Sequence, residues 1–316
     1  MNRQKDVNRF SYSRLSTYQQ CPRKHSYMYV EQIEPAALNQ FTVPGKLFHE
    51  AIEKILNKED PDPIFKKFRA LCQSGELDRE PDLLELLVTE YMNYYKKAYA
   101  RENTLLVEHQ SEDQFDEDHY FTAVIDQVYE RDGILTIRDL KTTSGSFKWD
   151  FEKVKTSPQL LIYALYAEEK IGQPIDAIEI DEVRLAKLEE PPINNNGKPS
   201  ADKRRLTNVT YEAFYNALEE RGLEDDKSYK DVLQYLEDRG HPLFKRTSFQ
   251  LLSQEMIQNN LEDLRELYES MLENRKFRTR GPLCNYCDYK QLCELDLHGS
   301  TTEDREILIT HIQRKR

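Results

Sequence analysis

The most informative stretch of the chain reads Tyr120-Phe-Thr-Ala-Val-Ile-Asp126-Gln-Val-Tyr-Glu130, then Arg131-Asp132-Gly133, then Ile134-Leu-Thr-Ile-Arg-Asp139-Leu140-Lys141. Two runs rich in β-branched residues flank an Asp-Gly pair, which is among the strongest short-range signals for a β-hairpin. Residues 120–130 and 134–141 are therefore predicted to form antiparallel neighbouring strands.

The predicted hairpin brings together two acids and a lysine. Side chains alternate between the faces of a strand, so Asp139 and Lys141 share one face and Leu140 points to the other. With Asp126 on the partner strand, this set makes a poor core but a good Mg²⁺ site, because Mg²⁺ prefers a few carboxylates together with water and phosphate oxygens. The lysine can orient a water or offset charge that develops on a phosphate. The alternative interpretation is a solvated surface strand, since Asp-x-Lys also recurs by chance.

Two predicted helices carry further polar candidates. Residues 43–56 begin with Pro44-Gly45 and place His49 at the edge of an apolar stripe with helical spacing. Residues 157–166 begin with Ser157 as N-cap and Pro158 at the first helical position, and they present Gln159 and Tyr163 on one face. Taken singly, each of these side chains is also compatible with packing or solvation.

The cysteine pattern indicates a metal centre. Cys284, Cys287 and Cys293 form a Cys-x2-Cys-x5-Cys cluster, and the sequence shows no signal peptide, which disfavours disulfides. Three thiolates need a fourth ligand for tetrahedral zinc or for an iron–sulfur cluster. Cys21 precedes a proline at the end of a helical pattern, whereas Cys72 has the pattern of a half-buried helical residue, so we choose Cys21. The spacing alone leaves zinc and iron–sulfur open.

In their order along the chain, these segments resemble the iron–sulfur RecB-like nucleases of the PD-(D/E)XK superfamily. That group includes the nuclease domain of AddB and standalone exonucleases associated with CRISPR adaptation and with phages. The matching motifs are Ser11-Tyr-Ser13, Cys21-Pro-Arg-Lys24, Gly45-Lys-Leu-Phe-His49, Asp126, Asp139-Leu140-Lys141-Thr142, Gln159 with Tyr163, and the closing cysteine triplet. One departure is Ala123, near the first aspartate, where the family usually has a glycine; alanine is a small replacement.

The resemblance implies roles for these residues. His49, Asp126 and Asp139, with the backbone carbonyl of Leu140, would bind one or two Mg²⁺ or Mn²⁺ ions. Lys141 would position or help deprotonate the water that attacks phosphorus, while Gln159 and Tyr163 would support the site or hold the strand. The resemblance favours a [4Fe–4S] cluster over zinc, and the ligands would be Cys21, Cys284, Cys287 and Cys293.

The expected fold is an α/β PD-(D/E)XK restriction-endonuclease-like core, a short mixed sheet flanked by helices, with helical insertions and an Fe–S cap. Residues 1–300 would form a single nuclease domain and residues 301–316 a C-terminal tail. Within the domain we predict a helical insertion over 57–104, a variable insertion over 188–250, and a cap from 11–30 and 277–298. Residues 178–186 alternate like a strand, residues 210–239 and 247–276 have the periodicity of amphipathic helices, and Tyr286 and Tyr289 are expected to be exposed.

The implied activity is a metal-dependent DNA exonuclease that acts on single-stranded or frayed ends in phage or bacterial recombination, repair or defence. The alternatives are a non-catalytic, cluster-stapled module that binds DNA or docks a partner, and a flap nuclease or endonuclease of the same fold. No phosphate-loop motif is present, so a helicase or a recombination or adaptation protein would be the partner that unwinds duplex.

Composition sets outer limits on these interpretations. The 316 residues carry a net charge of −12, which argues against a protein that coats DNA non-specifically. No apolar run is long enough to span a membrane, and a cytoplasmic location is expected. The basic run over residues 275–280 adjoins the cysteines and is a candidate rim for a DNA strand.

Overall fold

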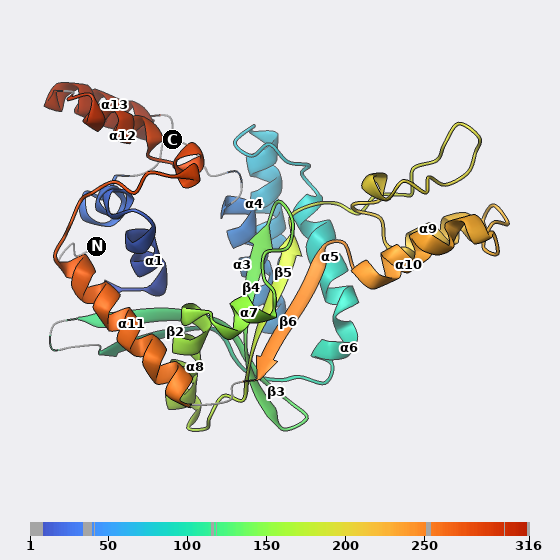
Figure 1. The fold of residues 1–316 in the computed structure, drawn as a ribbon, viewed down its shortest axis with the longest axis horizontal. Helices are drawn as coiled ribbons and strands as arrows, with labels where there is room; N and C mark the ends of the chain where they lie inside the picture. Colours follow the sequence, from blue (N-terminus) through green and yellow to red (C-terminus); the bar gives the residue numbers. More distant parts are fainter. Residues whose placement is uncertain are drawn as a thin grey trace.

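A six-stranded mixed sheet organises the computed structural model, which describes residues 9–33, 40, 42–114, 117, 119–250, 254–299 and 301–314 (Figure 1). The strands run in the order β1-β3-β4-β5-β6, and β2 also pairs with β3. The β4–β5 pair is parallel, whereas β2–β3, β3–β4 and β5–β6 are antiparallel. Their bounds are β1 (Arg9–Phe10), β2 (Asn103–Gln114), β3 (Tyr120–Arg131), β4 (Ile134–Thr143), β5 (Ala177–Arg184) and β6 (Phe244–Gln250). The predicted α/β fold with a mixed sheet is confirmed.

The predicted hairpin is present at β3–β4. Arg131 pairs with Ile134 across the turn, and the two turn residues, Asp132 and Gly133, have φ of 54° and 80°. Both therefore adopt the left-handed conformation that a tight two-residue hairpin turn requires, and Asp-Gly accepts it at low cost. The turn fixes the register of the two strands and thereby the positions of Asp126 and Asp139.

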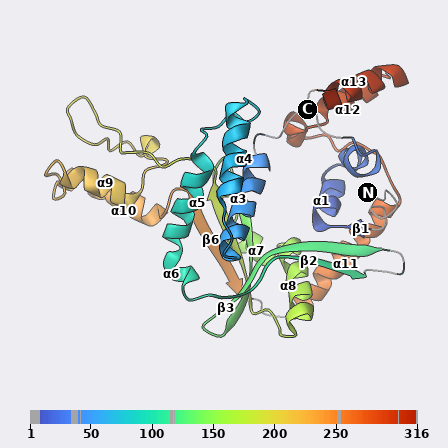
Figure 2. The ribbon, with the colours of Figure 1, turned by 180° about the vertical axis from the view of Figure 1, so that it is seen from behind.

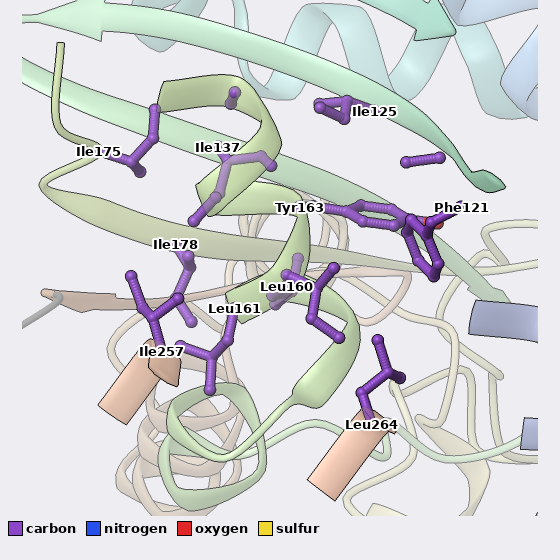
Figure 3. Close-up of a cluster of buried hydrophobic side chains, with 14 of the residues drawn as sticks. Phe121, Ile125, Ile137, Leu160, Leu161, Tyr163, Ile175, Ile178, Ile257 and Leu264 are labelled. Carbon is purple, nitrogen blue, oxygen red and sulfur yellow. The ribbon is translucent and has the colours of Figure 1, made fainter. Parts of the chain in front are cut away.

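Helices cover both faces of the sheet. On one face, α8 (Pro158–Ile171) and α11 (Gln254–Leu272) bury a core that includes Ile137, Ile178 and Leu161, each fully buried (Figure 3). On the other, α3 (Thr42–Leu56), α4 (Asp62–Gln73) and α5 (Leu83–Tyr94) pack on Leu140 and Val183. Burying each such aliphatic side chain contributes roughly 1.5–3 kcal/mol. The residues of β4 thus alternate between the two cores, which places Asp139 and Leu140 on opposite faces.

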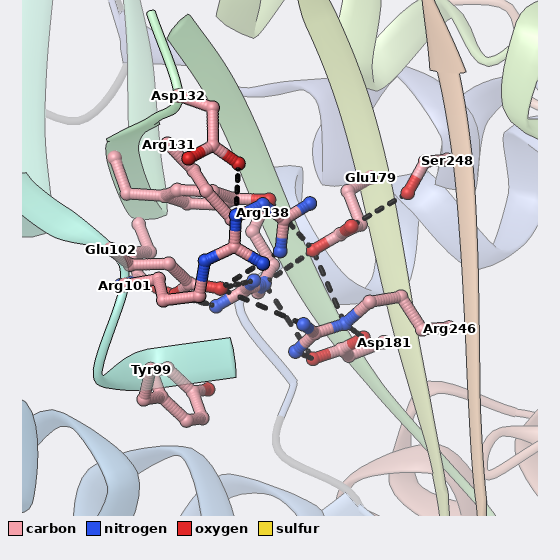
Figure 4. Close-up of polar contacts among 12 residues, drawn as sticks. Tyr99, Arg101, Glu102, Arg131, Asp132, Arg138, Glu179, Asp181, Arg246 and Ser248 are labelled. Atoms are coloured by element: carbon pink, nitrogen blue, oxygen red, sulfur yellow. Dashed lines mark hydrogen bonds and ion pairs between the residues drawn. The ribbon is translucent and has the colours of Figure 1, made fainter. Parts of the chain in front are cut away.

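A buried ionic network joins β4 to the neighbouring strands (Figure 4). Arg138 and Leu140 are two residues apart on β4, so the network lies on the Leu140 face of the sheet. Arg138 of β4 binds Glu102 at 2.7 Å and Glu179 of β5 at 2.7 Å. Arg246 of β6 binds Asp181 of β5, which also accepts the hydroxyl of Tyr91 at 2.6 Å. Burial acts to raise the pKa of Asp181, but Arg246 outweighs it and keeps that pKa below its usual value. Because each charge is paired, the network fixes β4 against β5, β6 and α5 without an uncompensated buried ion.

Two smaller units extend from the sheet. One lies between β5 and β6, contains α9 (Tyr211–Glu219) and α10 (Lys230–Arg239), and has its own core around Phe214 and Leu236. The other joins the two ends of the described chain, which lie side by side in Figures 1 and 2. Its elements are α1 (Tyr12–Gln20), α2 (Pro22–His25), η1 (Ser26–Val30), η4 (Pro282–Tyr286), α12 (Lys290–Leu297) and α13 (Thr302–Arg314). We call this second unit the cap.

Three details differ from the sequence-based expectation. Residues 247–250 belong to β6 rather than to the helix predicted over 247–276, and α11 begins only at Gln254. Tyr289 is buried and donates its hydroxyl to the backbone oxygen of Ile33 at 2.8 Å, so the prediction that it is exposed is wrong; Tyr286 is 83% exposed, as expected. The helical insertion predicted over 57–104 contains α4, α5 and α6 (Lys96–Tyr99), but its last two residues, Asn103 and Thr104, belong to β2. Among the helices described, none has the length and apolar character needed to cross a membrane.

Candidate active site

The site forms where β3 and β4 part. Their paired residues run from Arg131↔Ile134 to Gln127↔Arg138, and the next residues in the two strands are Asp126 and Asp139. The backbone N–H of Leu140 donates to Oδ2 of Asp126 at 2.7 Å. This hydrogen bond holds the Asp126 carboxylate against the backbone of β4 at the point where the two strands part.

Asp139, Lys141 and Gln159 form a hydrogen-bonded trio next to Asp126. Lys141 Nζ lies 2.7 Å from Oδ2 of Asp139 and donates to Oε1 of Gln159 at 3.1 Å. The amide of Gln159 donates in turn to Oδ1 of Asp139 at 3.4 Å. The contact between Asp139 and Lys141 confirms that they share a face.

The position of Gln159 follows from how α8 begins. Ser157 accepts the backbone N–H of Leu160 at 3.4 Å as the N-cap, and Pro158 occupies the first turn, as predicted. Tyr163, one turn on, is buried beside the same trio, and burial with the nearby charge of Asp139 raises the pKa of its phenol to about 12. The phenol therefore stays protonated and can only donate or accept hydrogen bonds there.

His49 reaches the site because α3 approaches β4 closely. A methyl group built on Gly45 would lie 2.4 Å from Oγ1 of Thr142, so only glycine fits at that contact. One turn later, Nδ1 of His49 lies 3.6 Å from Oδ2 of Asp126. Burial lowers the pKa of His49 to about 4, with Asp139 opposing and Lys141 reinforcing the shift. The imidazole is thus neutral at neutral pH and has a lone pair to give to a metal.

Glu108 on β2 is a site residue that the sequence reasoning missed. Its neighbours pair as Val107↔Gln127 and His109↔Ile125, which places Glu108 opposite Asp126. One ligand atom each from His49, Glu108 and Asp126 lies within 4.8 Å of the others, and this is the one such trio within the described residues. Asp139 is not part of that trio. The signal for Glu108 is non-local, since only the register of β2 against β3 brings it to Asp126.

The charges at the site suit a divalent cation. Burial raises the pKa of Asp126 well above its usual value, and the carboxylates of Asp139 and Glu108 raise it further. Burial likewise raises the pKa of Glu108 to about 7, with contributions from Glu53, Asp139 and Glu50. Lys141 contacts Asp139 at 2.7 Å, and the three carboxyl groups outnumber this one ammonium. A cation such as Mg²⁺ or Mn²⁺ would supply the missing positive charge and find oxygen and imidazole ligands.

A cleft of about 550 Å³ gives access to these groups. It is lined by the first turns of α3, by Glu108, and by the strand ends that carry Asp126 and Lys141. This volume is within the range of small-molecule sites and leaves room for a sugar-phosphate segment.

The predicted cluster cysteines converge in the cap. Cys21, Cys284, Cys287 and Cys293 all line a single cavity of about 450 Å³, whereas Cys72 packs among the helices of the α3–α5 face. Burial raises the pKa of the Cys287 thiol. No three of these sulfurs lie within 4.8 Å of one another in the part of the chain that the structure describes. The choice of Cys21 over Cys72 is consistent with this placement, and the identity of any bound group stays a prediction.

Comparison with known proteins identifies the arrangement. Residues 9–294 match the PD-(D/E)XK nuclease superfamily. The chain belongs to this superfamily. The match spans β1 to α12 and so includes the strands that carry both aspartates of the site.

Members of the PD-(D/E)XK superfamily are nucleases that typically use Mg²⁺ or Mn²⁺, in agreement with the charge of the site. Among solved structures, the crystal structure of SSO0001 is similar over 90% of this chain and 85% of that chain, with 11% sequence identity and a TM-score of 0.35. None of the curated proteins matches the chain.

Proposed function

We propose that this PD-(D/E)XK protein is a metal-dependent exonuclease that hydrolyses phosphodiester bonds from single-stranded DNA ends. The observation that carries the proposal is the group at the parting of β3 and β4, where Asp126, Lys141 and His49 line one cleft. Asp139 is buried next to this cleft and contacts Lys141 at 2.7 Å. A non-catalytic DNA-binding module has no use for an excess of buried carboxylates beside a phosphate, because they would repel it.

Part of the proposed ligand set has support in the geometry, because His49, Glu108 and Asp126 each offer a ligand atom within 4.8 Å of the others. These three residues would hold a divalent cation, and Asp139 with the Leu140 carbonyl would complete the set. When bound, the cation would polarise the scissile phosphate and lower the pKa of the attacking water.

Lys141 has a distinct task. Burial acts to lower its pKa, but the carboxylates of Asp139 and Asp126 outweigh burial and hold the pKa above its usual value. The side chain is therefore an ammonium that donates hydrogen bonds, so it orients the attacking water and offsets charge on the phosphate rather than removing a proton. Gln159 fixes this ammonium, since its Oε1 accepts from Nζ while its amide faces Asp139. The phenol of Tyr163 hydrogen-bonds to the side chain of Gln159 and so helps to hold it in place.

The cap carries the second half of the proposal, that the protein is a RecB-like member with a [4Fe–4S] cluster held by Cys21, Cys284, Cys287 and Cys293. Support comes from their arrangement around one cavity. A tetrahedral zinc ion with bonds of about 2.3 Å would need all four sulfurs within about 4 Å of each other. No three of these sulfurs, all in the described part of the chain, lie within 4.8 Å of one another. This wider spacing supports the larger iron–sulfur cluster over zinc. The cluster would fasten α1 to the C-terminal segment, a closure of more than two hundred residues.

The wider organisation is part of the same proposal. Residues 1–300 would act as one nuclease domain, with insertions over 57–104 and over the part of 188–250 that precedes β6, because residues 244–250 pair with β5 in the sheet. A partner helicase or recombination protein supplies single-stranded ends in a bacterial or phage-infected cytoplasm, because the sequence has no phosphate-loop motor.

Linear and circular single-stranded DNA test the proposed activity. With Mn²⁺, the wild type should shorten linear DNA from one labelled end, leave circular DNA intact and stop when chelator is added. Asp139→Asn should be inactive, because it removes charge at constant size. Asp132→Asn is the matched control: it makes the same chemical change on the exposed turn of the same hairpin, and Asn-Gly preserves the turn. Cleavage of circular DNA would show that the protein is an endonuclease rather than an exonuclease. If the wild type cleaves neither substrate, a catalytic role is refuted.

A further inference from the structure

A second polar groove lies on the cap, apart from the residues that line the active-site cleft. It encloses about 420 Å³ and is lined by Arg23, Lys276, Arg278, Asp296, Thr301, Thr302 and Arg305. Four of these seven residues are cationic and one is acidic. In a protein with a net charge of −12, such a concentration of positive charge is unusual and calls for a ligand of opposite sign.

The groove is built from three distant parts of the chain. The backbone N–H of Arg23, in α2, donates to the carbonyl of Phe277 at 3.0 Å and so fixes the segment that follows α11. Lys276 and Arg278 flank Phe277 and both face the groove. Thr301 caps α13 by accepting the N–H of Asp304 at 3.2 Å, and Arg305 lies one turn into the same helix.

Existing pairs hold part of this charge in place without neutralising all of it. Arg23 and Arg305 each form ion pairs with the same two carboxylates, those of Asp296 and Glu31. Asp296 also accepts a hydrogen bond from the hydroxyl of Tyr27 at 2.6 Å. Two cations are thereby balanced by two carboxylates, while Lys276 and Arg278 remain in excess. In the described part of the chain, Nε of Arg23 and of Arg278 is buried and has no hydrogen-bond acceptor. The side chains of Arg23 and Arg278 line the groove, and a phosphate offers several oxygens to the remaining N–H donors of their guanidinium groups.

We propose that this groove binds a phosphate group of the nucleic-acid strand, at a position remote from the bond that is cleaved. The proposal rests on the proposed nuclease function for the identity of the polyanion, but it assigns a separate binding site. Arg23 and Arg278 also border the cysteine cavity, so the groove and the predicted cluster share a wall. A strand held there would be kept on the enzyme while its end is processed.

Lys276 and Arg278 are the residues to change, because Arg23 and Arg305 have structural ion pairs. The test measures binding of fluorescent single-stranded DNA in the Asp139→Asn background, so that no cleavage occurs. Lys276→Ala with Arg278→Ala should weaken binding about tenfold and make the slope of log affinity against log salt shallower by about 1.4, or roughly 0.7 for each lost phosphate contact.

Arg275→Ala is the matched control. Arg275 is 62% exposed, pairs with Glu273 at 2.5 Å and does not line the groove, although it is adjacent to Lys276 in sequence. It should leave both affinity and slope near the wild-type values. Equal losses in the control and the double variant would overturn the proposal, as would no loss in either.

Two further experiments complete the test. The first distinguishes a DNA phosphate from free phosphate as the ligand, and the second tests the nuclease proposal separately from the groove. Inorganic phosphate at 10-fold excess over the DNA phosphates should compete only weakly with DNA for the wild type. If it instead abolishes DNA binding by the wild type but not by the double variant, the groove is a site for free phosphate. That result would overturn the proposal that the groove binds a strand. Hydrolysis of bis(p-nitrophenyl) phosphate by the double variant with an intact Asp139 should match the wild type, because Lys276 and Arg278 do not line the active-site cleft. If neither protein hydrolyses it while DNA binding still differs, the nuclease proposal fails and the groove stands.

Discussion

The contact between Gly45 and Thr142 tests how the fold positions the proposed metal site. A Cβ at residue 45 would lie 2.4 Å from Oγ1 of Thr142, about 1 Å closer than an ordinary contact. Threonine is branched at Cβ and stiff about χ1, so it cannot simply swing this oxygen away. In Gly45→Ala, the first turn of α3 must therefore shift by up to about 1 Å, and His49, one turn later, shifts with it.

We expect the Gly45→Ala variant to remain folded but to lose metal affinity and activity. Overpacking costs about 1–3 kcal/mol of stability, and a misplacement of about 1 Å in a catalytic group can reduce the rate ~100-fold. The assays are Mn²⁺ binding by calorimetry, kcat/KM on linear single-stranded DNA, and thermal unfolding.

A second substitution makes the test specific. Thr142→Ala removes both Oγ1 and Cγ2 and leaves Cβ at 3.5 Å from the new methyl group, which is an ordinary contact. Thr142→Ala alone should bind Mn²⁺ like the wild type, and the double variant should recover most of what Gly45→Ala loses. The reasoning is refuted if Gly45→Ala alone is normal, or if the double variant is as impaired as Gly45→Ala.

Three other predictions concern separate parts of the molecule. Glu108→Gln should weaken Mn²⁺ binding at least tenfold in calorimetry while the protein stays folded, since it removes one charged ligand from the trio with His49; an unchanged affinity would exclude Glu108 as a ligand. Anaerobically purified wild type should be brown with about four irons per chain, and Cys293→Ser should lose this visible absorbance whereas Cys72→Ser keeps it; equal loss in both, or bound zinc in the wild type, would contradict the cluster. Burial lowers the pKa of His241 to about 4. Between pH 6.5 and 4 the folded state therefore binds fewer protons than the unfolded state. As the pH falls through this window, the free energy of unfolding should fall by up to about 3 kcal/mol. His241→Phe should make chemical unfolding less sensitive to pH there, and an unchanged pH dependence would show that His241 does not contribute.

The hairpin and its two neighbouring helices could be predicted because their signals are local. Asp132-Gly133 specifies a turn whatever surrounds it, and alternation on either side then fixes which face carries Asp139 and Lys141. Ser157-Pro158 likewise specifies a helix start. The metal-ligand candidates His49 and Asp126 came from motifs, and the structure brings them together.

What the sequence did not predict depends on long-range pairing. Glu108 becomes a site residue only through the register of β2 on β3, and nothing in its own neighbourhood marks it. The periodicity of residues 247–276 predicts a helix that includes the last four residues of β6, but their pairing with β5 outweighs that preference. Tyr289 lies between cysteines that are partly exposed, yet its ring packs against Tyr27 and its hydroxyl reaches Ile33 from the opposite end of the chain. In each case the partner is more than fifteen residues away.

Mn²⁺ anomalous diffraction from crystals of the wild-type protein tests whether the parting of β3 and β4 forms a divalent-metal site. A strong peak is expected in contact with the Asp126 carboxylate and the Leu140 carbonyl, and with His49 among the remaining ligands. A well-diffracting crystal soaked in Mn²⁺ that shows no peak there, or shows its strongest peak elsewhere on the molecule, would contradict it.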